Sequence, residues 1–108
     1  MKESNFAAPE ALLPVPNPAV IFRALPDGAV LFHSDEEVYF GLNPVGARVW
    51  ESLPPARRSL DELTDALHKE YPEVDRKELQ SDVIELLDRL RTEHLVLPSS
   101  EEVTADAP

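Results

Sequence analysis

Residues 38–50 read VYFGLNPVGARVW and contain the change from strand to helix that decides the fold. The stretch opens with β-branched and aromatic residues, which favour an extended chain. Asn43 is suited to accept hydrogen bonds from the first amides of a helix, and Pro44 has no amide hydrogen to lose at the first helical position. We therefore predict a short strand over residues 38–40 and, directly after it, a helix that continues to Leu53.

Two more strands are expected before this stretch. Residues 19–25 and 29–33 are rich in Val, Ile, Leu and Phe, and a Pro-Asp-Gly turn at residues 26–28 separates them. A polar turn at residues 34–37 then leads into the strand at 38–40. The simplest arrangement is a three-stranded antiparallel meander. Because so small a sheet is marginal alone, one of its faces must be covered.

Two further helices can supply that cover. Ser59 and Glu62 predict a capping box at the start of a helix over residues 59–71. The longest helix is expected over residues 75–93, with Asp75 suited to cap its start. Its predicted core stripe has helical spacing and consists of Leu79, Val83, Leu86 and Leu90. With a short extended segment at residues 94–97, the order predicts an α+β fold: a winged helix-turn-helix-like body with a three-stranded antiparallel sheet followed by three helices.

The two ends of the chain look unsuited to a core. Residues 1–18 contain four prolines, and residues 98–108 are polar and acidic. Proline lacks a backbone donor, and acidic polar segments bury little apolar area to offset the entropy of ordering. We predict a flexible Pro-rich tail over residues 1–18, one folded domain over residues 19–97, and an acidic flexible tail over residues 98–108.

The composition limits the function. The chain has no cysteine, which excludes disulfides and thiolate zinc sites and fits a cytoplasmic location. No apolar run approaches the roughly 20 residues needed to cross a bilayer. The net charge is −11, and nine basic against sixteen acidic residues leave about −7 on residues 19–97. Such a body would be repelled by nucleic acid and by anionic membranes, so we expect neither as a partner.

No catalytic or cofactor motif stands out. His33, His68 and His94 lie in different predicted elements and lack the paired spacing of metal-binding helices. The chain has only three glycines and neither a Gly-rich phosphate loop nor a G-x-S-x-G motif. We therefore predict that the chain is not an enzyme and holds no metal or cofactor.

Three segments together resemble the PqqD family. They are the stretch at residues 38–50, the run SLDEL at residues 59–63, and the last helix with its closing His94-Leu95-Val96. The similarity covers about residues 19–97. The linker PPARR at residues 54–58 departs from the Asp-Gly pair that many family members have after the first helix.

The resemblance implies a recognition element of pathways that modify ribosomally made peptides. Family members bind the leader of a precursor peptide and present it to a maturation enzyme such as a radical enzyme, a peptidase or a cyclase. The leader adds as an antiparallel strand to the edge of the third strand and packs against the third helix. In such β-augmentation, backbone hydrogen bonds give affinity and side-chain pockets give selectivity.

This mode of binding suggests two sets of site residues. The edge that receives the peptide would be Val38, Tyr39 and Phe40, of which one set faces the groove because side chains alternate. The third helix would add Ile84 and Leu87 as apolar pockets and Asp88 and Arg91 as charged partners. The alternative is that the apolar residues complete the core and the charged ones form a solvated surface.

Two other functions remain open at this stage. A winged helix can bind DNA, but residues 75–93 carry four basic and six acidic residues, the opposite of the balance that a groove-reading helix needs. The other alternative is a generic protein–protein interaction module without a precursor peptide.

Overall fold

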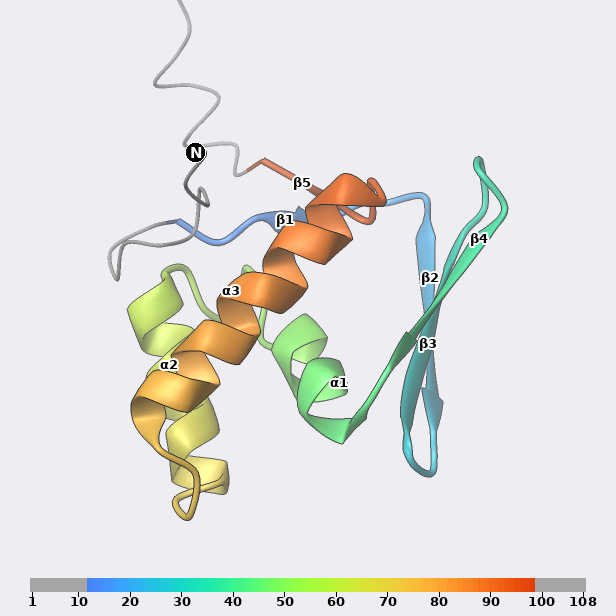
Figure 1. Cartoon of the computed structure of the whole chain (residues 1–108). Helices are drawn as coiled ribbons and strands as arrows, with labels where there is room; N and C mark the ends of the chain where they lie inside the picture. The colour runs from blue at the N-terminus through green and yellow to red at the C-terminus, as the bar shows by residue number, and fades with distance from the viewer. Residues whose placement is uncertain (1–11, 99–108) are drawn as a thin grey trace, which may run out of the picture.

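The computed structural model describes residues 12–98 (Figure 1). The predicted strands and helices are all present, with two short strands in addition. In chain order the elements are β1 (Val15–Pro16), β2 (Val20–Leu25), β3 (Gly28–His33), β4 (Val38–Leu42), α1 (Pro44–Glu51), α2 (Leu60–Glu70), α3 (Arg76–Thr92) and β5 (Val96–Leu97). The tails predicted over residues 1–11 and 99–108 lie outside the described residues.

The central sheet has the order β2-β3-β4 and is antiparallel throughout, which confirms the predicted meander. Its register aligns an inner row, Phe22, Leu31 and Phe40, which faces the helices. The alternate outer row, Ile21, Phe32 and Tyr39, faces away from them. One face of the sheet is thus covered by helices, and the other remains open to solvent (Figure 1).

The junction between β4 and α1 is as compact as the sequence suggests. The Asn43 Oδ1 atom accepts a hydrogen bond from the Gly46 amide at 2.7 Å, and Pro44 occupies the first turn. Gly28, at φ 146°, lies against the backbone of Leu42 and Asn43, where a Cβ atom would overlap the Leu42 carbonyl. Only glycine fits this approach, and it holds the β2–β3 turn next to the start of α1.

Helix α2 has the Ser59 half of the predicted capping box, while the Glu62 carboxylate accepts from the Arg58 amide at 3.0 Å instead of the Ser59 amide. Helix α3 lacks its predicted cap. The Ser59 Oγ atom accepts a hydrogen bond from the Glu62 amide at 3.2 Å. Asp75 makes no side-chain cap at the start of α3. Instead, Arg76 bonds to Asp61 at 2.6 Å and to Asp65 at 2.8 Å, so the first turn of α3 is fixed by ion pairs to α2.

The core stripe of α3 differs by one position from the prediction. Its buried residues are Leu79, Val83, Leu87 and Leu90, whereas Leu86 is half-buried. Both sets have helical spacing, so the sequence pattern alone could not separate them. Packing against α1 and α2 turns the Leu87 side of α3 inward and leaves Leu86 half-buried.

Residues 12–18 belong to the fold instead of the predicted flexible tail. β1 pairs with β5 in a second, two-stranded antiparallel sheet, and the Leu13 amide donates to the Arg58 carbonyl at 2.9 Å. Leu13 is only 1% exposed and lies in the main core. Pro14 and Pro16, which follow it, do not prevent this, because a short edge strand leaves their missing donors unneeded.

Leu13→Ala should lower the free energy of unfolding by about 2–5 kcal/mol, since it removes a buried leucine and leaves a cavity. Leu25→Ala is the matched control, because Leu25 is 47% exposed at the end of a strand, and a change of less than about 1 kcal/mol is expected. Urea denaturation followed by circular dichroism measures both. Equal losses would show that residues 12–18 do not pack as described.

Candidate functional site

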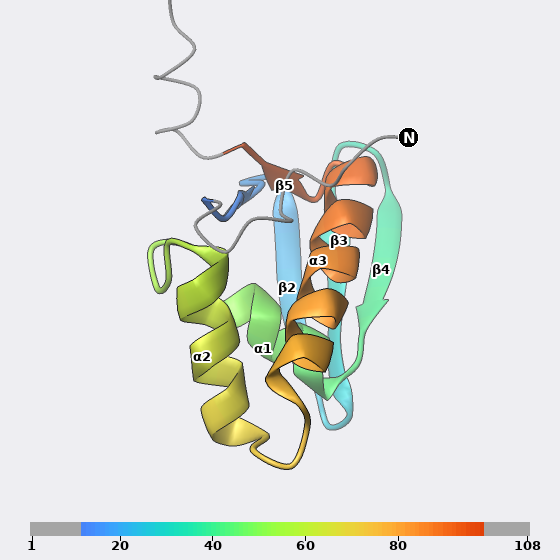
Figure 2. The same cartoon turned by 60° about the vertical axis from the view of Figure 1, so that its left-hand side comes forward.

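β4 is an edge strand with a neighbouring strand on one side only. β3 pairs with it along its whole length, and α3 crosses the helix-covered face of the sheet next to β4 (Figure 2). Val38 and Phe40 point to the helix side and are half-buried. Tyr39 points away, is 71% exposed, and contacts Phe32 with ring centroids 4.7 Å apart.

Two hollows border α3, and Arg89 lines both. The smaller, of about 210 Å³, lies at Phe40 and the last turns of α3, next to Asp88 and Thr92. The larger, of about 440 Å³, lies between α1 and residues 78–89 of α3. Because Arg89 borders both, the two hollows form one groove, which begins at Phe40 of β4 and continues between α3 and α1.

The contact that separates the two hollows joins α3 to β4. The guanidinium carbon of Arg89 lies 5.1 Å from the centroid of the Phe40 ring. A guanidinium over an aromatic face is attracted by the negative potential of the ring. The contact thus places a positive charge in the middle of the groove.

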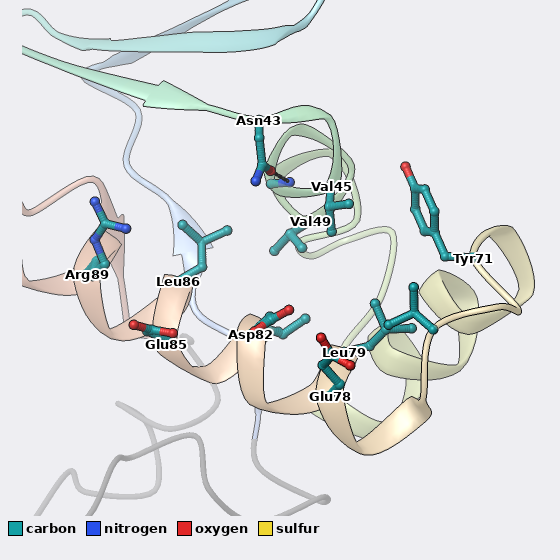
Figure 3. A pocket seen from close by; sticks show the side chains of 13 residues that line it. Asn43, Val45, Val49, Tyr71, Glu78, Leu79, Asp82, Glu85, Leu86 and Arg89 are labelled. Carbon is teal, nitrogen blue, oxygen red and sulfur yellow. Dashed lines mark hydrogen bonds between the residues drawn. The ribbon is translucent and has the colours of Figure 1, made fainter.

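The larger hollow combines an apolar lining with acidic side chains. Val45 and Val49 of α1 face Leu79 and Leu86 of α3, with Tyr71 at one end (Figure 3). Three carboxylates of α3, Glu78, Asp82 and Glu85, also line it. A side chain entering this hollow would meet aliphatic surface and negative charge together.

Arg48 and Arg76 form ion pairs that connect the helices. Arg48 of α1 pairs with Glu51 at 3.2 Å and with Glu70 of α2. Its hydrogen bond to Glu70 is the main cause that raises the pKa of Arg48 and lowers the pKa of the Glu70 carboxyl. The hydrogen bonds of Arg76 to Asp61 and Asp65 likewise raise the pKa of its guanidinium. These two arginines hold the helices together and form no ion pair with Glu78, Asp82 or Glu85.

The structure brings part of the predicted site together. Phe40 and Asp88 both line the smaller hollow, and Val38 lies on the same face of β4 as Phe40. Tyr39 lies on the opposite face of the sheet, as one of the two alternating sets had to. Arg91 is exposed and lines neither hollow.

Ile84 and Leu87, the two α3 residues that were predicted to form apolar pockets, do not line the groove. Leu87 is fully buried in the core, and Ile84 packs half-buried against it, so neither lines a hollow. The groove residues that the prediction missed are Leu86 and Arg89, with Asp82 and Glu85 beside them. The helical spacing of these four residues can be seen in the sequence. It identifies them as groove residues only when the face of α3 that packs into the core is known.

The histidines do not form a common site. His33 is buried, with Nε2 3.4 Å from the Asn17 side-chain nitrogen, and His94 Nδ1 lies 3.2 Å from a Glu36 carboxylate oxygen. His68 is half-buried on α2. Within residues 12–98, no three His, Asp or Glu side chains are close enough together to hold a metal ion. The same residues include no helix that is both long and apolar enough to cross a bilayer.

Comparison with known proteins agrees with this architecture. The family model described as coenzyme PQQ synthesis protein D (PqqD) matches residues 28–96. A solved structure described as TbiB1 in complex with the TbiA(beta) leader peptide is 34% identical to this chain, with a TM-score of 0.68. The match covers 76% of this chain and 93% of that one. A search of curated proteins found no match.

The placement of Leu86 and Leu87 can be tested by paired truncation. Leu87→Ala should lower the free energy of unfolding by about 3 kcal/mol, because its side chain is fully buried. Leu86→Ala should cost only about 1–2 kcal/mol, because one side of Leu86 faces the groove. Chemical denaturation measures the free energy of unfolding of both variants. A larger loss for Leu86→Ala than for Leu87→Ala would mean that Leu86, and not Leu87, faces the core.

Proposed function

The chain belongs to the PqqD family, and on this basis we propose that it binds the leader of a ribosomal precursor peptide and presents it to a maturation enzyme. Its role is binding and presentation, without catalysis of its own. The observation that carries the proposal is the likeness to TbiB1, whose solved structure is described as a complex with a leader peptide. That likeness extends over most of both chains.

The groove beside β4 supports strand addition as the mode of binding. An edge strand offers a row of backbone donors and acceptors that an extended peptide can pair with. β4 has five residues and ends at the capped start of α1, so the added strand would be short. The turn before β4 carries three acidic residues at positions 35–37, which limit pairing with other edges.

Side chains of the added strand would provide selectivity. Those that point toward α3 would enter the hollows at Phe40 and Leu86, and the alternate ones would face solvent. Val38, Phe40 and Asp88 keep the roles predicted from the sequence, and Leu86 and Arg89 take the places proposed for Ile84 and Leu87. Arg91 is exposed and lines neither hollow, so the proposed groove gives it no role.

Presentation requires a second surface, and the open face of the sheet supports one. Ile21 is 53% exposed there and Tyr39 71%, with Phe32 half-buried between them. Exposed apolar residues in contact with one another are typical of protein interaction sites. We propose that the maturation enzyme, a radical enzyme, a peptidase or a cyclase, contacts this face while the leader occupies the groove.

The two faces of β4 can be separated by adjacent substitutions. Phe40→Ala should weaken binding of the leader encoded nearest the gene by about tenfold or more, because it removes the aromatic wall of the groove. Tyr39→Ala is the matched control, and less than about a threefold change is expected because its side chain faces away. Isothermal titration calorimetry measures both affinities, with amide NMR spectra to verify that each variant is folded.

Titration of labelled wild-type protein locates the peptide independently. Amide shifts centred on residues 38–42 and 82–93 are expected. Unchanged affinity in a folded Phe40→Ala variant, or shifts confined to the opposite edge at β2, would rule out the β4 groove. The absence of any shift at high concentration of this leader would instead favour a generic interaction module.

A further inference from the structure

The carboxylates of the larger hollow differ from other acidic residues of the helices in lacking a partner. Within residues 12–98, Glu78, Asp82 and Glu85 make neither a hydrogen bond nor an ion pair with their side chains. Their spacing of four and three residues places them on one side of α3, along the hollow. Three like charges on one helix face repel one another, and Arg89 is the single basic residue that lines the same hollow, so its lining keeps a net negative charge.

The arrangement favours a cation on a side chain over a metal ion. The three carboxylates are spread along two turns and do not converge on one point. Beside them, Val45, Val49 and Leu86 provide aliphatic surface. A lysine or arginine suits both features, because its stem packs on apolar surface while its charged end reaches the carboxylates.

The direction of β4 decides which part of a bound peptide reaches this hollow. β4 runs toward Asn43, and Asn43 lines the larger hollow. An antiparallel added strand runs the opposite way, so the residues that precede its paired segment lie under α1. The paired segment itself passes Phe40, and the residues that follow it leave at the end where β4 begins.

We propose that the larger hollow selects leaders in which a lysine or arginine, next to an apolar side chain, precedes the segment that pairs with β4. The selection rests on the proposed function, because it needs a peptide strand at β4 to place the cation. It adds a charge requirement at one end of the groove to the general preference for an extended peptide.

A display selection tests this without knowledge of the natural leader. Full-length protein is the bait for random peptides of about 15 residues, enough to cover β4 and the larger hollow at roughly 3.3 Å per residue. One enriched peptide is then synthesised in two forms, with its N-terminal-side lysine or arginine kept or replaced by norleucine. Both are titrated against three proteins at about 20 mM and about 500 mM NaCl, because salt screens exposed charges.

The second protein is the triple variant Glu78→Gln, Asp82→Asn and Glu85→Gln. The third is a matched control that removes the same number of charges outside the groove and the sheet, with Glu101→Gln, Glu102→Gln and Asp106→Asn. Norleucine should weaken binding to the wild type and to the control by roughly fivefold at low salt, and to the groove variant by less than about twofold. At high salt, the affinities of the wild type for the two forms of the peptide should become more alike.

The outcomes separate this proposal from the proposed function. Enriched peptides that shift the amides of residues 38–42 but carry no cation, or a norleucine effect that persists in the groove variant, would overturn the charge requirement and leave strand addition intact. A norleucine effect lost equally in the control variant would assign it to net charge and overturn the specific site. If no peptide is enriched, the peptide-binding function falls, and the charge requirement with it.

Discussion

The hydrogen bond between the Asn43 side chain and the Gly46 amide fixes the point at which strand becomes helix. With a single residue between β4 and α1, the helix cannot swing away, and it packs directly against the inner face of β3 and β4. The glycine at position 28 allows the neighbouring turn to approach the same point. α1 thus lies between the sheet and the middle of α3 and leaves a hollow between the two helices. The groove is a result of this separation.

The sequence allowed the main architecture to be predicted because its strongest signals are local. The Pro-Asp-Gly turn, the Asn43-Pro44 pair and the Ser59 cap each act within a few residues, and all three appear in the structure. The pairing of β1 with β5 joins segments that are far apart in the sequence, and no local sequence pattern predicts it. Leu13 was therefore left among prolines as part of a tail, although it lies in the core.

The site was less predictable for a related reason. Its existence followed from the resemblance, but its residues on α3 depend on a rotation of that helix by one position. Leu86 and Leu87 are adjacent leucines with equally good helical spacing, and only the packing of α1 and α2 decides which one is buried. Asp75 shows the same limit, because a good capping residue is left unused where Arg76 can bond to Asp61 and Asp65 instead.

The β1–β5 pair brings the first and last described parts of the chain together at one end of the domain, the end at which β4 begins (Figure 1). An antiparallel leader would leave its groove at that same end. If a catalytic domain were tethered to either end of the chain, the part of the precursor peptide that follows the leader would emerge close to that domain. The effective concentration of the peptide at the catalytic domain would then be set by the length of the linker instead of by diffusion. Because β1 pairs with β5, a catalytic domain fused before β1 and one fused after β5 would be tethered at the same end of the domain.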